Sequence, residues 1–220
     1  MNSEQQVPLF EEIGDPQARR VLDWYPTPAW MTLALLRREP VRGPVLEAAV
    51  GDGAIRRVLE SQGLTVVGND VDESRAAEYH EDITRPEAWE RFGLTCPWAG
   101  TNLPFNVADE VVPLAVDWLY RHKGPGPFGV AFLLRLSWLE PTEARGIWLK
   151  AHPPHRVIVL PRHDFRGNGQ TDSVTSAWFV WRPDVFAPWG VEVVTKDERD
   201  ELIAESAKAS AEPEAADVCR

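Results

Sequence analysis

The chain has 220 residues, of which 44% are hydrophobic and 26% are charged. This length and composition predict a single globular domain with a substantial core, and no apolar run approaches the ~20 residues of a membrane-spanning helix. The two cysteines, Cys96 and Cys219, are too far apart in the sequence to suggest a disulfide framework or a metal site. We therefore expect a protein of the reducing cytoplasm with no membrane association.

The charge is acidic but unevenly distributed. A formal net charge of −11 argues against non-specific nucleic-acid binding by the whole chain. Residues 119–182, however, contain nine Lys/Arg and four Asp/Glu, a balance of +5, which leaves −16 for the remainder. A basic section inside an acidic chain either meets phosphate groups or forms an ordinary solvated surface, and the composition favours neither.

The first half of the chain alternates between helix and strand patterns. Residues 1–22 read as an arm, after which Thr27 and Pro28 suit the N-cap and the first position of a helix. The elements expected here are, in order, a helix over residues 28–38, a strand over 45–50, a helix over 54–62, strands over 65–71 and 81–83, and a helix that begins near residue 84.

The second half continues this alternation, which predicts an α/β, doubly wound, mostly parallel sheet. After an apolar approach over residues 96–100, the expected elements are a helix over 108–121, a strand over 128–136, a helix over 140–151, and strands over 156–160 and 176–181. The last two strands have only a loop between them, so we expect an antiparallel pair at one edge. Residues 195–220 read as an acidic surface helix or a disordered tail, which leaves residues 23–194 as the folded domain.

The hexapeptide Thr101-Asn102-Leu103-Pro104-Phe105-Asn106 lies between a strand pattern and a helix pattern. It is therefore expected at the carboxyl end of a strand, the edge at which open α/β sheets bind ligands. An amide, a rigid proline and an aromatic ring side by side can hold a flat heterocycle that carries an amino group. The alternative is a plain turn in which Pro104 ends the strand and Asn106 caps the next helix.

A second motif follows the first buried strand. Glu47 is succeeded by a turn with Gly51 and Gly53, whose lack of side chains lets the backbone approach a ligand. Asp70 comes 19 residues after Gly51, at the end of the next strand, where a carboxylate can accept both ribose hydroxyls. The three-glycine dinucleotide fingerprint and the Gly-Lys-Ser/Thr phosphate loop are both missing. A plain turn with a helix-capping Asp52 is the alternative.

Together these motifs resemble a known family. Glu47-x-x-x-Gly51-x-Gly53, then Asp70, Asp82 and Asn102-x-Pro104-Phe105, are similar to the ordered motifs of class I S-adenosylmethionine-dependent methyltransferases. In particular they resemble the branch that methylates exocyclic amines of bases, including small phage and prophage DNA adenine methyltransferases. The resemblance covers residues 23–183 and implies a seven-stranded Rossmann-like sheet with an antiparallel last strand.

The resemblance also implies roles for individual residues around S-adenosylmethionine. Gly51 and Gly53 would face the cofactor, and Glu47 would orient their loop or meet the methionine amino group. Asp70 would hold the ribose and Asp82 the adenine amino group. The remaining cofactor-binding residues would be Tyr25, Thr27, Pro28 and Asn102, although a simple start of a helix also explains Tyr25 to Pro28.

The chemistry implied for the hexapeptide is a grip on an aromatic amine. The Asn102 side-chain carbonyl and the Leu103 main-chain carbonyl would accept its two N–H groups, which aims the nitrogen lone pair at the methyl donor. Pro104 would keep the segment rigid and Phe105 would stack on the base. A base in a duplex would first have to be flipped out of the stack.

Candidate substrate-binding residues lie in the basic section. Arg135 ends the predicted central strand and either reaches the site or pairs with Glu140. Arg162, Phe165 and Arg166 belong to a loop with cations, an aromatic ring and two glycines, which can contact phosphates and stack on a base. An ordinary hairpin loop is the alternative.

The sequence therefore favours methylation of the exocyclic N6 amine of adenine in DNA. One departure from the pattern is Leu103, where the DNA enzymes usually have proline; Asn-Leu-Pro-Phe resembles the ribosomal RNA adenine dimethyltransferases instead. Methylation of adenine in RNA, methylation of the cytosine N4 amine in DNA, nucleotide-dependent redox chemistry and a non-catalytic S-adenosylmethionine-binding module stay open. The sequence also leaves open whether the chain forms a homodimer.

Overall fold

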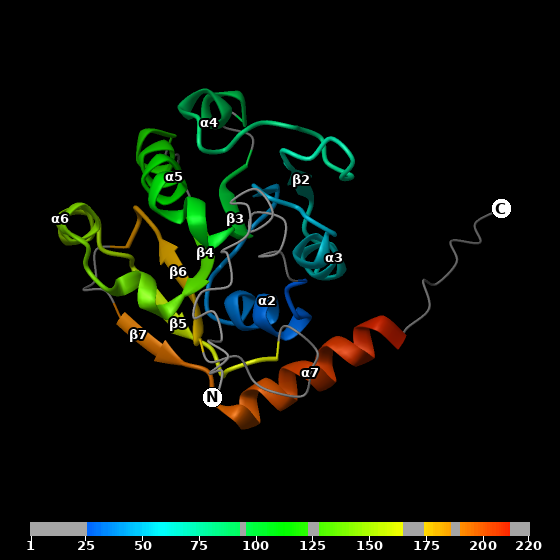
Figure 1. The fold of residues 1–220 in the computed structure, drawn as a ribbon. Helices are drawn as coiled ribbons and strands as arrows, with labels where there is room; N and C mark the ends of the chain where they lie inside the picture. The colour runs from blue at the N-terminus through cyan, green and yellow to red at the C-terminus, as the bar shows by residue number, and fades with distance from the viewer. Residues whose placement is uncertain (1–25, 93–95, 123–127, 165–173, 186–189, 212–220) are drawn as a thin grey trace, which may run out of the picture.

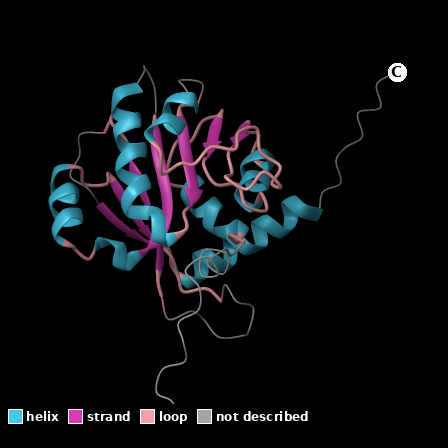
Figure 2. Cartoon of the chain, turned by 45° about the horizontal axis from the view of Figure 1, so that its top comes forward, coloured by secondary structure: helices cyan, strands magenta, loops and turns pink. Residues whose placement is uncertain are grey.

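The computed structural model describes residues 26–92, 96–122, 128–164, 174–185 and 190–211, which form a seven-stranded sheet with helices on both faces (Figures 1 and 2). The strands are β1 (Val45–Glu47), β2 (Val66–Gly68), β3 (Trp98–Asn102), β4 (Gly129–Arg135), β5 (Arg156–Val159), β6 (Ser176–Trp181) and β7 (Gly190–Val193). Their order across the sheet is β2-β1-β3-β4-β6-β5-β7.

The helices form two layers. One face of the sheet carries α4 (Pro86–Phe92), α5 (Ala108–His122) and α6 (Glu143–Ala151), and the other carries α2 (Ala29–Leu36), α3 (Ala54–Ser61) and α7 (Lys196–Ala211). Short 3-10 turns, η1 (Phe105–Val107) and η2 (Leu136–Leu139), follow β3 and β4. None of the helices in the described ranges is long and apolar enough to cross a membrane.

The strand directions confirm the doubly wound α/β sheet of seven mostly parallel strands. Only β6 runs against its neighbours, pairing antiparallel with both β4 and β5. One detail differs from the sequence prediction, because the β5–β6 pair is not at the edge. Strand β7, which the sequence analysis did not assign, adds parallel to β5 and forms the edge instead.

The strand predicted over residues 81–83 is also wrong. Among the described residues, a single bridge between Asn69 and Tyr79 is all that extends the sheet beyond β2. The main-chain N–H and carbonyl of Glu81 bond to the side-chain amide of Asn69 rather than to a neighbouring strand. The carboxylate of Asp82 then accepts from the N–H of Thr84 at 3.0 Å, which turns the chain toward α4.

Burial explains why the central strands are readable from the sequence. Strand β4 is buried along its length except for Arg135 at its end, and β6 is buried throughout. Strands covered on both faces need apolar side chains on both, which gives continuous apolar runs. The two helical layers pack against the opposite faces of these strands and form two cores.

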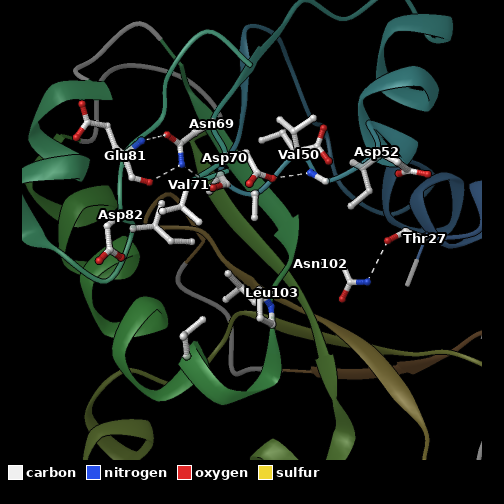
Figure 3. Close-up of a pocket in the computed structure, with 18 of the residues that line it drawn as sticks. Thr27, Val50, Asp52, Asn69, Asp70, Val71, Glu81, Asp82, Asn102 and Leu103 are labelled. Carbon is white, nitrogen blue, oxygen red and sulfur yellow. Dashed lines mark hydrogen bonds between the residues drawn. The ribbon is translucent and has the colours of Figure 1, made fainter. Parts of the chain in front are cut away.

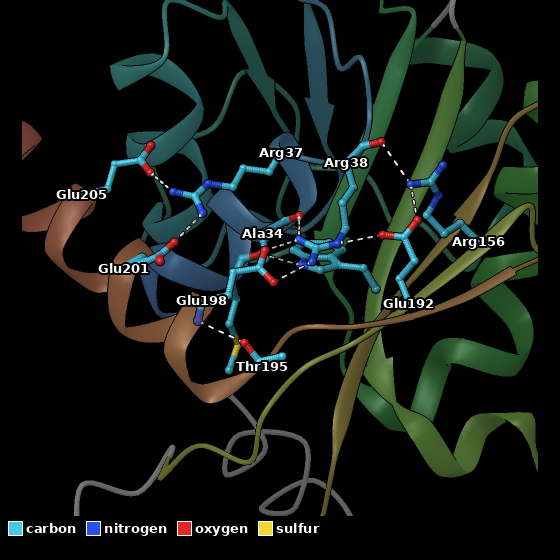
Figure 4. A network of polar contacts seen from close by, with 11 residues as sticks. Ala34, Arg37, Arg38, Arg156, Glu192, Thr195, Glu198, Glu201 and Glu205 are labelled. Atoms are coloured by element: carbon cyan, nitrogen blue, oxygen red, sulfur yellow. Dashed lines mark hydrogen bonds and ion pairs between the residues drawn. The ribbon is translucent and has the colours of Figure 1, made fainter.

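Helix α7 docks on α2 through a buried apolar side chain and several ion pairs. Leu202 is fully buried in the core shared with α2. At the end of α2, Arg37 contacts Glu205 at 2.6 Å and Arg38 contacts Glu198 at 2.8 Å. Figure 4 shows these acidic side chains of α7 facing the two arginines. The acidic character of the C-terminal segment is therefore partly neutralised within the fold.

The docking of α7 predicts a large effect of one substitution. Leu202→Ala should lower the free energy of unfolding by about 2–4 kcal/mol, because it removes a fully buried side chain and leaves a cavity. The adjacent Ile203→Ala is the matched control, since Ile203 is 44% exposed, and its cost should stay below about 1 kcal/mol. Urea unfolding measures both, and equal losses would show that α7 does not pack on α2 through Leu202.

Candidate functional site

A cavity of about 240 Å³ opens at the carboxyl ends of β1, β2 and β3 (Figure 3). Eight residues singled out from the sequence line it: Thr27, Glu47, Gly51, Asp70, Asp82, Asn102, Leu103 and Pro104. Other lining residues include Ala48 to Val50, Asp52, Asn69, Val71, Glu81, Ile83, Thr84 and Val107. The structure thus brings the glycine turn, the acidic strand end and the hexapeptide to one place.

The glycine turn and Asp70 are joined directly. Gly51 and Gly53 have φ values of 57° and 77°, which L side chains rarely adopt. The N–H of Gly51 donates to Asp70 Oδ2 at 2.8 Å, and the N–H of Asp72 donates to Asp70 Oδ1 at 3.0 Å. Each carboxylate oxygen has a second lone pair, so Asp70 can still accept hydroxyl groups while its orientation is fixed by the main chain.

Asn69, beside Asp70, is the main feature that the sequence analysis missed. Its Nδ2 donates to the carbonyls of Ala48 and Glu81, both at 3.0 Å, and its Oδ1 accepts from the N–H of Glu81 at 2.8 Å. One buried amide therefore holds the segments that follow β1 and β2 against the segment that carries Asp82. The only sequence signal was a polar residue at the end of an otherwise apolar strand.

Glu47 supplies a buried acidic group at the base of the cavity. It is 1% exposed, and its Oε2 has no hydrogen-bond partner within the described residues. Burial raises the pKa of Glu47 to about 8, although the main chain and side-chain charge of Arg56 act in the opposite direction. A carboxyl group in this state favours a ligand that brings a cation or a hydrogen-bond donor.

Asn102 is held by a residue from a distant part of the chain. Its Nδ2 donates to the hydroxyl of Thr27 at 3.1 Å, and Thr27 is only 6% exposed. The N-cap position of α2 is occupied by Pro28, so Thr27 orients the amide instead of capping the helix. In Figure 3 the nitrogen of the amide points at Thr27, and the Asn102 oxygen lies on the other side.

The rest of the hexapeptide divides between core and surface. Leu103 is 1% exposed, whereas Pro104 is exposed and lines the cavity. Phe105 is half-buried and does not line the cavity, but the guanidinium carbon of Arg135 lies 4.3 Å from the centroid of its ring. The predicted substrate-binding residue Arg135 is therefore in contact with Phe105, which was predicted to stack on the base.

The other predicted residues are placed less centrally. Gly53 and Pro28 do not line this cavity, and Arg162 is exposed beyond the end of β5 without lining it. Asp82 lines the cavity, but its Oδ1 also accepts from the hydroxyl and N–H of Thr84. Tyr25, Phe165 and Arg166 lie outside the described residues.

The charge of the cavity restricts its ligands. Within the described part of the chain, five carboxylic acids line it, namely Glu47, Asp52, Asp70, Glu81 and Asp82, and no lysine or arginine does. A pyrophosphate would be repelled here, whereas an amine or a sugar hydroxyl would be favoured.

Neither a scan with models of protein families nor a search of curated proteins finds a match to the chain. Among solved structures, the methyltransferase subunit of a type I restriction-modification system from Streptococcus thermophilus superposes over 84% of this chain, with a TM-score of 0.56 and 14% identity. The chain has a methyltransferase fold. This finding confirms, at the level of fold, the resemblance to the class I S-adenosylmethionine-dependent enzymes.

Two further structures share the methyltransferase fold. The type I restriction enzyme EcoKI M protein has a TM-score of 0.50 and 14% identity over 73% of this chain, and a DrdV–DNA complex has 0.52 and 12% over 85%. The chain spans 53% of the Streptococcus protein, 44% of the EcoKI M protein and 30% of the DrdV chain. It therefore corresponds to about half or less of each.

Burial of Glu47 predicts a pH-dependent stability. In an unfolded chain the side chain of Glu47 ionises at about pH 4.3. In the folded chain it keeps its proton up to about pH 8. Unfolding releases this proton between the two values, so its contribution to the free energy of unfolding is full below pH 4 and falls as the pH rises toward 8.

Glu47→Gln, which cannot ionise, isolates this effect. Relative to the variant, the wild-type free energy of unfolding should fall by on the order of 2–4 kcal/mol between pH 5 and pH 8. Urea unfolding at half-unit pH steps measures the difference. Parallel pH profiles for the two proteins would show that Glu47 is not buried as an acid.

Proposed function

We propose that the protein transfers a methyl group from S-adenosylmethionine to the exocyclic N6 amine of adenine in DNA. The observation that carries this proposal is the single cavity that contains both Glu47 with Asp70 and the Asn102-Leu103-Pro104 segment. The first pair suits a nucleoside that carries an amine, and the second suits an amino-bearing ring. A methyl donor and its acceptor would need to meet in this way.

The residues present fit S-adenosylmethionine. Glu47 Oε2 is a buried acceptor without a partner in the described chain, which suits the methionine amino group. Asp70 is held by two main-chain N–H groups and keeps lone pairs for the ribose hydroxyls. Val71, 69% exposed at the rim, offers an apolar surface to the adenine ring. When bound, the cofactor supplies an activated methyl group.

The chain's own part in the reaction is to position the amine. Hydrogen bonds from an aromatic amine to Asn102 Oδ1 and to the Leu103 main-chain carbonyl would draw the nitrogen toward a tetrahedral form and aim its lone pair. Thr27 holds Asn102 so that the carbonyl, not the NH₂ group, is available. Because the Leu103 contact uses the main chain, a leucine in place of proline preserves it. The rate gain then comes mainly from orientation and electrostatics.

DNA is the substrate that the structural similarities favour, since type I modification subunits and a DNA complex share the fold. RNA stays a second candidate because of Leu103. With this leucine, the Asn-Leu-Pro-Phe segment proposed to bind the amine resembles the ribosomal RNA adenine dimethyltransferases. Adenine is favoured over cytosine by the family resemblance alone. One product analysis resolves both choices, DNA against RNA and adenine against cytosine.

Asn102→Ala tests the mechanism. The protein is incubated with methyl-labelled S-adenosylmethionine and separate pools of duplex DNA, single-stranded DNA and RNA, which are digested to nucleosides. Wild type should give labelled N6-methyladenine from DNA, and Asn102→Ala should lower turnover by roughly 100-fold or more because one of two acceptors for the amine is lost. Asn106→Ala, an exposed asparagine four residues away, is the control and should keep wild-type turnover.

Each outcome of this assay bears on a different part of the proposal. Label on cytosine, or in RNA alone, would contradict the choice of substrate. Full turnover in Asn102→Ala would contradict the proposed role of Asn102 in binding the amine. Absence of label from every pool would contradict the enzymatic function.

A further inference from the structure

Arg135 lies beside the proposed grip and has no carboxylate partner among the described residues. It is the exposed last residue of β4, and its guanidinium carbon is 4.3 Å from the centroid of the Phe105 ring. The alternative pairing with Glu140, considered from the sequence, does not form, and Arg135 makes no ion pair with any carboxylate in the described ranges. Its positive charge is therefore not neutralised by the part of the chain that the structure describes.

Strand register places this charge on the same side of the sheet as the grip. Asn102 of β3 is paired in parallel with Leu133 of β4. Side chains of paired residues, and of residues two apart along a strand, point to the same face. Asn102, Leu133 and Arg135 therefore share a face, and Arg135 extends beyond the end of β3, next to Phe105.

Arg135 can offset the acidity of the adjacent cavity when a polyanion binds. Among the described residues, the adjacent cavity is lined by five carboxylic acids and by no lysine or arginine, which disfavours the approach of a nucleic-acid backbone. Among the described arginines, only Arg42, Arg135 and Arg162 lack an ion pair. Of these three, Arg135 is the one in contact with the hexapeptide. A phosphate beside the site would therefore meet it first.

The contact with Phe105 is incompatible with a base stacked on the same ring face. A guanidinium is planar and stacks on aromatic rings much as a base does. At 4.3 Å it covers the face that it contacts. A cation–π contact at an exposed site is weak, so a phosphate can draw the guanidinium away.

We propose that Arg135 covers the Phe105 ring in the free protein and moves to a substrate phosphate when the target base stacks there. This inference rests on the proposed function and adds to it a residue that couples entry of the base to recognition of the backbone. Arg135 then uncovers the Phe105 ring and neutralises the phosphate in one step. The residue acts in substrate binding and has no part in activating the amine.

The salt dependence of binding tests this role. The equilibrium dissociation constant for a fluorescent 20-base-pair duplex is measured from 50 to 300 mM KCl in the presence of S-adenosylhomocysteine. Loss of one phosphate contact should reduce the slope of log Kd against log salt by about 0.9 in Arg135→Ala, whereas Arg135→Lys should keep the wild-type slope. Arg42→Ala, which removes an unpaired arginine between α2 and β1, should also keep it.

Steady-state kinetics separate binding from chemistry. With adenine at the target position, Arg135→Ala should raise the KM for DNA by about 10-fold and lower kcat by less than about 2-fold, because contacts to the phosphate contribute to binding. An unchanged salt slope in Arg135→Ala, with methylation and binding by wild type intact, would overturn this inference alone. Failure of wild type to bind any nucleic acid would overturn the proposed function together with it.

Discussion

The side-chain amide of Asn69 joins the segments that form the walls of the cavity. It bonds to the main chain of Ala48, after β1, and twice to the main chain of Glu81, in the segment before α4. Because this amide is buried, its removal would leave main-chain groups without partners, at a cost of about 1–3 kcal/mol for each group. The positions of Glu47, Asp70 and Asp82 relative to one another therefore depend on a residue that carries no charge.

The acidity of the cavity explains which ligands the fold can serve. Burial leaves Glu47 with a pKa of about 8 and an oxygen that has no partner among the described residues, a cost that an amine-bearing ligand offsets. A dinucleotide would bring a pyrophosphate to a site lined by five carboxylic acids, which disfavours the redox alternative. The nucleic-acid backbone faces the same repulsion, so cations beside the cavity, such as Arg135, matter for the substrate.

The sequence predicts those parts of the structure that depend on local pattern. Continuous apolar runs indicate β4 and β6 because these strands are buried on both faces, and the order of the motifs brings Asp70 and Asn102 to one edge of the sheet. Tertiary contacts decide the rest. The conformation of Glu81 is set by the side chain of Asn69, which follows β2. The hydrogen bond between Asn102 and Thr27 joins residues that are 75 positions apart in the sequence. Strand β7 has only four residues, and its alternation of Val191, Glu192 and Val193 is too short to stand out.

Calorimetric titration with S-adenosylmethionine tests the central claim, that this cavity is the methyl-donor site. The wild-type protein should bind one equivalent, and Asp70→Ala should weaken the affinity by about 10-fold or more, since it removes hydrogen bonds to a charged acceptor. Asp72→Ala, which changes a carboxylate outside the cavity lining, should bind as wild type does. Equal affinity of Asp70→Ala and wild type, or no binding by wild type, would contradict the account.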